Sequence, residues 1–405
     1  MKVFKYLLLF YILTIVNFSK LNAQSLDSLL QLVVENNTQL KAIELEYQSI
    51  LAKQSQVSQL PNPQFGVGIP VLRPETRLGP QMVMVSATQF FPWFGTLKSK
   101  EAVVVSMSKV KYEQLAIVKL DLFYEVQSAY FQLYFLNQKL AILAKNIQIF
   151  ESLETVSLAK IEVLRIQTRL QGLRQQILMI ENDKSIFEST INEITKQPIG
   201  SKIIVSDNLI LPAMEFNIES FRSKLESNHP LITQINYQIE QSSKTLVVNS
   251  NMNKPAVGIG LDYSLVGQRT DANPQYNGRD ILVPRVMVSI PIYRKAYKGK
   301  IEEERLIQES LGYKKENVLD KMLRLLVSYK ANFDNGQLES ELYQNQTNTI
   351  QMAYDVLLAE YSSSGKGFEE LLMVQNQLLD FELGVSQAEL KRNLAQSNIE
   401  RITNF

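Results

Sequence analysis

The residue types that most often perform catalysis or bind metals are scarce in this sequence. Cysteine is absent, and the single histidine, His229, is followed by a proline that suits the first turn of a helix. A lone histidine without cysteines argues against a tight metal site. No nucleophile–base cluster, glycine-rich phosphate loop or pair of carboxylates stands out. We therefore expect no enzymatic activity, cofactor or metal centre, and the balance of 42 basic against 41 acidic residues argues against nucleic-acid binding.

An aromatic segment indicates a different kind of chemistry. Phe90, Phe91, Trp93 and Phe94 stand where an expected strand passes into an expected helix. Aromatic rings favour the boundary between lipid and water, so these side chains are candidates for a membrane interface. The alternative is ordinary packing between strand and helix, and both roles can hold together.

The elements that would position these residues are mainly long amphipathic helices. Apolar residues recur in steps of three and four over about 122–150, 166–194 and 371–399. Such a 3.5-residue repeat keeps one apolar seam against a partner helix. Residues 97–160 contain no glycine or proline, whereas Gly299, Gly312 and Gly336 interrupt a similar stretch at 296–361. We expect long antiparallel helical hairpins.

Two segments between the helices have the period-two alternation of β-hairpins. They cover about 62–92 and about 255–293, with loops expected at about 73–80 and 267–280. Asp262 and Arg285 fall on the faces opposite the apolar rows, as a wall with an apolar outside and a polar inside requires. The sequence therefore predicts four strands per chain.

The chain reads as two copies of one unit. The segment Pro63–Ile69 parallels Pro255–Leu261, and residues 163–167 parallel 371–375 in the same order. We expect a first repeat at 24–197, a linker at 198–216 that lies outside the main helix bundle, and a second repeat at 217–405. Each repeat would hold a helix, a β-hairpin and a long helix pair.

The first residues predict a secretory signal peptide at 1–23. Lysines precede a short apolar run, and Ala23 stands before the expected cleavage point. No later run of about 18 apolar residues appears, so a bilayer crossing would have to use strands. Roughly eight strands are the minimum for a closed wall. Three copies of four strands would give a twelve-stranded wall.

Three segments resemble the TolC-like outer-membrane efflux family, and the resemblance covers nearly the whole mature chain. They are residues 89–95, where strand passes into helix, residues 286–293 at the equivalent place in the second copy, and residues 359–372. The last resembles the family's helix-turn-helix tip, in which a tyrosine precedes a glycine turn and an acid precedes leucine. The first two resemble members that export heavy-metal cations.

The resemblance implies a homotrimer whose 12-stranded β-barrel, with four strands from each chain, lies in outer-membrane lipid and whose helices form a periplasmic tunnel. Such a channel exports solutes passively from the periplasm. It also implies docking to a periplasmic adaptor and an inner-membrane RND transporter. The tip residues that match the family are Glu370, as an acid at the channel constriction, Tyr361 and Lys366, as parts of a latch, and Gly365, as the turn. Their alternative role is ordinary tip surface, and for Glu370 a solvated acid near a helix N-terminus. Glu369 and, at the first tip, Glu162 are further acidic candidates.

The first copy lacks about eight residues at its tip, including the glycine turn. The sequence predicts either a tight tip around 159–164 or a shortened hairpin. Two alternatives to the efflux reading stay open. One is a periplasmic coiled-coil structural or adaptor protein, and the other keeps the channel but gives it type I secretion of proteins in place of metal or drug export.

Overall fold

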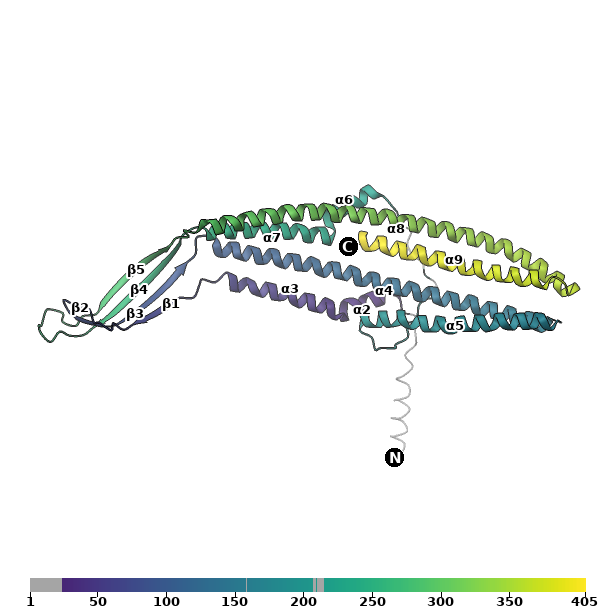
Figure 1. Cartoon of the computed structure of the whole chain (residues 1–405), viewed down its shortest axis with the longest axis horizontal. Helices are drawn as coiled ribbons and strands as arrows, with labels where there is room; N and C mark the ends of the chain where they lie inside the picture. The colour runs from purple at the N-terminus through teal and green to yellow at the C-terminus, as the bar shows by residue number, and fades with distance from the viewer. Residues whose placement is uncertain (1–23, 158, 207–208, 210–214) are drawn as a thin grey trace, which may run out of the picture. The chain divides into compact units, whose positions relative to one another are not determined.

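The computed structural model describes residues 24–157, 159–206, 209 and 215–405. The expected signal peptide, 1–23, lies outside the described residues. Each half of the sequence leads from two helices through strands to two longer helices (Figure 1). The first half forms α2 (Leu26–Asn36), α3 (Thr38–Val57), β1 (Gln64–Gly68), β2 (Glu75–Thr76), β3 (Gly79–Phe91), α4 (Thr96–Val156) and α5 (Lys160–Thr195). The second half forms α6 (Ile218–Asn228), α7 (Pro230–Met252), β4 (Ala256–Val266), β5 (Ile281–Ser289), α8 (Arg294–Ser364) and α9 (Phe368–Thr403).

The contacts divide the chain into two compact units that cut across the sequence halves. The first unit takes residues 24–41, 117–229 and 321–405 of the described chain, and the second takes 42–116 and 230–320. Each unit therefore contains parts of both predicted repeats, and α4 and α8 contribute to both units. Within the described residues, no helix is long and apolar enough to cross a membrane.

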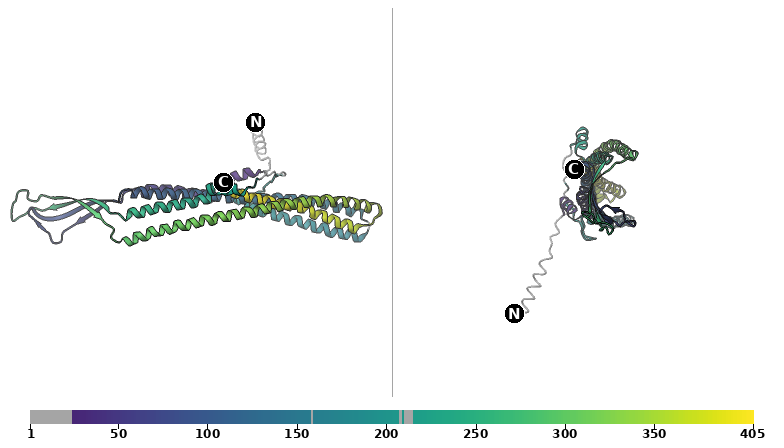
Figure 2. Two further views of the ribbon diagram at one scale, coloured as in Figure 1. Left: turned by 90° about the horizontal axis from the view of Figure 1, so that it is seen from above. Right: turned by 90° about the vertical axis from the view of Figure 1, so that its left-hand side faces the viewer.

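The core of the first unit lies among α4, α5, α8 and α9. Figures 1 and 2 show α5 running back along the end of α4, and α9 along the end of α8. The heptad residues that the sequence singles out face inward, and Leu143, Ile166 and Leu173 are fully buried. Truncating one of these leucines to alanine would cost about 2–5 kcal/mol.

The glycines of α8 do not interrupt it, contrary to expectation. The helix runs 71 residues through Gly299, Gly312 and Gly336. A Cβ at Gly336 would lie 3.0 Å from the backbone oxygen of Ala388 and 3.0 Å from the backbone nitrogen of Arg392. This glycine therefore lets α9 approach α8 closely, and the approach outweighs the helix-breaking tendency of about 1 kcal/mol.

The two helical hairpins turn in three residues each. Residues 157–159 join α4 to α5, and 365–367 join α8 to α9. The returning helices α5 and α9 both have 36 residues, whereas α4 has 61 and α8 has 71. The segment between the helices is thus no shorter at the first tip than at the second, and the missing length lies in the outgoing helix α4, as the shortened-hairpin alternative predicted.

The second unit holds an antiparallel sheet in the order β1-β3-β4-β5. The longest pairings join β3 to β4 and β4 to β5, so strands from the two sequence halves lie side by side. Part of the segment expected as a loop at 73–80 is a short fifth strand instead, because Glu75 and Thr76 of β2 pair with Pro80 and Gly79.

The expected linker, 198–216, forms neither helix nor strand in its described residues, and it packs against helices within the first unit. Ile203 and Val205 are buried. The Tyr130 hydroxyl accepts a hydrogen bond from the backbone nitrogen of Ser206 at 3.1 Å, and Lys202 pairs with Glu188 at 3.2 Å. These contacts tie the segment to α4 and α5.

Candidate functional site

One face of the sheet is apolar and exposed along β1, β3, β4 and β5. Directly opposed residues share a face, and register places Val85 beside Tyr263 and Ile259 beside Val286. Phe65, Val67 and Val286 are each more than 70% exposed. The apolar row consists of Phe65 and Val67 in β1, Val85 and Phe91 in β3, Val257, Ile259, Leu261, Tyr263 and Leu265 in β4, and Leu282, Val286 and Val288 in β5.

The opposite face holds small, hydroxyl and charged residues, together with a few apolar ones such as Met84. It carries Ser86 and Thr88 of β3 and the glycines at 66, 68, 258 and 260. It also carries the two charged residues that β1, β3, β4 and β5 contain between them. Those two charges are Asp262 and Arg285, so the expectation that they avoid the apolar rows is confirmed.

The two charges form one cluster across three strands. Arg285 Nη2 lies 3.3 Å from Asp262 Oδ1 and donates to Thr88 Oγ1 at 3.3 Å. Gly260 stands directly across from Arg285, and a Cβ there would come within 2.9 Å of Thr88 Oγ1. The glycine therefore leaves room for the guanidinium to reach over β4, and the pair neutralises its own charge on this face.

The four aromatic residues of the candidate interface segment differ in their surroundings. Phe90 lies on the small-residue face, where a Cβ at Gly258 would meet its ring at 2.9 Å, so its contacts are packing contacts. Trp93 and Phe94 stand beyond the end of β3 with ring centroids 6.1 Å apart, and Phe94 is 89% exposed. Lys254 places its ammonium 5.5 Å from the Trp93 ring. Phe91 lies on the apolar face, and these three rings have the exposure that an interface requires.

At the tips of the first unit, the structure brings together two of the expected residues, Tyr361 and Glu162. The buried Tyr361 hydroxyl donates to Glu162 Oε2 at 2.9 Å and lies 3.2 Å from Ser157 Oγ. Phe368 packs against the Tyr361 ring at 5.7 Å. Burial raises the pKa of Tyr361, and the Glu162 carboxylate adds to this effect, so the phenol stays protonated and able to donate.

The other tip candidates are at the surface. Glu369 forms an ion pair with Arg165 of α5, a partner that the sequence did not suggest. Glu370 and Lys366 are exposed, and Glu370 stands in the first turn of α9, where the helix dipole favours an acid. Gly365 has φ of 64° and Gly367 of 82°, so both supply the left-handed backbone that the turn needs.

Sequence reasoning missed a buried series of side-chain hydrogen bonds between α4 and α9. Gln375 Nε2 donates to Asn146 Oδ1 at 2.7 Å, Asn146 Nδ2 donates to Glu382 Oε2 at 3.2 Å, and Lys145 bonds Glu382 at 2.7 Å. Asn146 and Gln375 are both fully buried. Asn146 directly precedes the heptad residue Ile147 and Gln375 directly follows Val374, which was the available signal, and their hydrogen bond joins the two helices.

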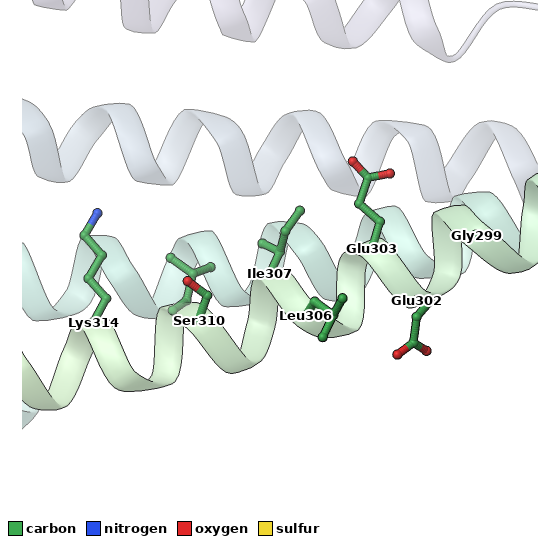
Figure 3. Close-up of a pocket in the computed structure, with 8 residues that line it drawn as sticks. Gly299, Glu302, Glu303, Leu306, Ile307, Ser310 and Lys314 are labelled. Atoms are coloured by element: carbon green, nitrogen blue, oxygen red, sulfur yellow. The ribbon is translucent and has the colours of Figure 1, made fainter.

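The first turns of α8 present an exposed hollow in the second unit (Figure 3). Leu306 and Ile307 lie at its centre and are 57% and 40% exposed. Glu302, Glu303 and Lys314 stand around them, so the surface is an apolar strip with charged margins. A strip of this kind suits contact with another helix.

The fold is similar to that of solved outer-membrane channels, at low sequence identity. No family model and no curated protein matches the sequence. The structure of the outer-membrane channel OprN is similar at a TM-score of 0.74 and 13% identity, covering 93% of this chain and 89% of that one. CusC, described in its transmembrane channel formation, gives 0.74 and 13% over 95% of both chains. The open state of the Neisseria gonorrhoeae MtrE outer-membrane channel gives 0.72 and 12%, covering 93% and 88%. The likeness confirms the expected fold class of long helices with a small β part.

Proposed function

We propose that this chain is one protomer of a passive outer-membrane channel that lets solutes leave the periplasm. The observation that carries the proposal is the exposed apolar face of the sheet, backed by a face that holds the glycines, hydroxyls and both strand charges. An apolar surface of this extent needs an occupant. Lipid on one side and a water-filled passage on the other satisfy both faces.

The sheet needs further strands to work in lipid. β1 and β5 are its outer strands, and their outward backbone groups would lack partners in a hydrocarbon layer. Four strands are also fewer than the roughly eight that close a wall. A homotrimer solves both problems, because β5 of one copy can pair with β1 of the next to complete a twelve-stranded ring.

The helices form the periplasmic duct in this proposal. The apolar strip around Leu306 and Ile307 supports contact with a helix of a neighbouring copy. The tips would dock a periplasmic adaptor, with an inner-membrane RND transporter as the source of energy. Glu370 and Glu369 would face the inner mouth, and the Tyr361–Glu162 bond would hold the tip, with Lys366 and Gly365 in the adjoining turn.

The cargo follows from the sequence resemblance alone, which favours metal cations or drugs over secreted proteins. A periplasmic coiled-coil adaptor, the other alternative, would leave the apolar sheet face in water and therefore predicts a product that is soluble without detergent.

The test is the assembly and conductance of the purified full chain. We expect a detergent-solubilised trimer by native mass spectrometry and stepwise ion currents when it is inserted into a planar bilayer. A protein that stays monomeric in plain buffer and carries no current would refute the proposal. Heat-unfolded protein, added at the same concentration, controls for leakage caused by detergent.

A further inference from the structure

A band of positive charge lies where the sheet of the second unit meets its helices. Four segments make this junction: 58–63, 92–100, 251–255 and 290–300. They contain seven basic residues and no acidic residue, although the whole chain has 42 basic and 41 acidic residues. We call these seven the basic collar: Lys98, Lys100, Lys254, Arg294, Lys295, Lys298 and Lys300.

The collar cations contact aromatic rings rather than carboxylates within the chain, with Lys254 over Trp93 and Lys300 over Tyr297. Six of the seven side chains belong to exposed residues, Lys100 being half-buried. Among the residues that the structure describes, none of the seven forms an ion pair with a carboxylate. Four of them stand in the first two turns of α8, where the helix dipole disfavours cations and no acid occupies the first turn. Ion pairing within the chain and the helix dipole therefore do not explain why the charges are there.

The collar continues directly from the apolar surface of the sheet. Ile290, Ile292 and Tyr293, which follow β5, are 58%, 72% and 81% exposed and lead straight into Arg294. Phe94 leads into Lys98 in the same way after β3. The chain thus passes twice from apolar strand through aromatic side chains to cations, the order of environments from hydrocarbon to headgroups.

The collar also ends sharply. Glu302, Glu303 and Glu304 follow Lys300 by one turn, and the first two point away from α8 in Figure 3. A general excess of positive charge would continue along α8 beyond Lys300. The collar cations are therefore confined to a narrow zone at the junction between the sheet and the helices. Long lysine and arginine stems can lie along the apolar surface while their charged ends reach such a zone.

We propose that the basic collar binds the phosphate groups of anionic phospholipids in the leaflet next to the helices. The inference rests on the proposed channel function, because it takes the sheet to be in lipid. Each cation near an anionic surface strengthens binding by about fivefold, and salt screens the effect over about 8 Å at physiological strength.

The protein carries its own probe for this site. Trp93 is the single tryptophan, and it lies within 5.5 Å of the Lys254 ammonium. The full chain is reconstituted in bilayers of phosphatidylglycerol and phosphatidylcholine, with bromine on one lipid or on the other. Because bromine quenches tryptophan only at short range, the ratio of the two quenching values gives the lipid preference at the collar.

We expect phosphatidylglycerol to be preferred at Trp93 at least fivefold, and the preference to fall at least fivefold in Arg294→Gln/Lys295→Gln/Lys298→Gln/Lys300→Gln. The matched control, Lys315→Gln/Lys321→Gln/Arg324→Gln/Lys330→Gln, removes the same charge from the same helix outside the collar and should keep the preference. Added inorganic phosphate should not compete.

Four outcomes would overturn the inference. Equal quenching by both lipids, or an equal loss in the control variant, would show that the collar has no lipid preference while leaving the channel intact. Full competition by inorganic phosphate would assign the site to free anions. Quenching by neither lipid would remove Trp93 from the membrane and would refute the proposed function as well.

Discussion

A lysine placed on one face of the sheet or the other tests which face meets lipid. Val286 lies on the apolar face near the middle of β5 and is 73% exposed. Val283, in the same strand, lies on the opposite face directly across from Asp262 and is 47% exposed. Val286→Lys and Val283→Lys therefore introduce the same side chain three residues apart on opposite sides.

The expected costs differ widely. A lysine on the lipid face costs about 2–4 kcal/mol at the membrane midplane and about 0–1 kcal/mol near the interfaces. Three copies of Val286→Lys would therefore cost about 6–12 kcal/mol per assembly, which is comparable with the whole stability of a domain. Val283→Lys sets an ammonium beside a carboxylate, a cross-strand pair that contributes about 0.2–1 kcal/mol.

The assay is insertion of each purified variant into phosphatidylcholine vesicles, followed by protease protection of the sheet and by the fraction recovered as trimer. We expect Val283→Lys to insert like the parent protein and Val286→Lys to stay outside the vesicles. Equal insertion of the two variants, or failure of Val283→Lys alone, would show that the apolar face does not meet lipid.

Four further predictions concern charges and the tips. Asp262→Asn should shift the reversal potential in a salt gradient toward anions, and Arg285→Gln should shift it toward cations, because each leaves its partner uncompensated; no shift in either variant would place the pair outside the passage. Tyr361→Phe should increase hydrogen exchange at the first tip about fivefold or more, since one buried bond of about 1–2 kcal/mol is lost, and unchanged exchange would show that the bond does not hold the tip. Glu370→Ala should weaken cation block in single-channel recordings, and an unchanged block would remove this side chain from the mouth. Burial lowers the pKa of His229 from 6.5 to about 4. The unfolded chain therefore takes up the proton first, and the free energy of unfolding should fall as pH drops from about 6.5 to about 4, by up to about 3 kcal/mol. Thermal unfolding of His229→Gln in detergent should lack this pH dependence, and an equal dependence in the variant would assign it to other groups.

Periodicity was sufficient to predict the helices and most of the sheet. The heptads of α5 and α9 placed Ile166 and Leu371 in the core, and alternation in β4 and β5 placed Asp262 and Arg285 on the face away from the apolar rows. Both patterns depend on local geometry, which the sequence carries in its spacing.

Contacts between distant segments were not predictable in the same way. The bond from Tyr361 to Glu162 and the pair of Arg165 with Glu369 join residues about two hundred positions apart, and no local spacing marks them. The glycine pattern in α8 misled for a related reason, because the close approach of α9 at Gly336 is a tertiary effect that outweighs intrinsic propensity. The place of Phe90 on the small-residue face was readable from its even spacing with Thr88.

The pairing of β3 with β4 has a consequence for how the chain is made. β3 ends at Phe91 and β4 begins at Ala256, so a polypeptide emerging from its N-terminus presents one apolar strand long before its neighbour exists. Strand pairings between residues so far apart in sequence form slowly, and the intermediates that precede them are prone to aggregate. The yield of assembled protein would therefore depend on a chaperone that binds β1 and β3 until β4 and β5 have been made.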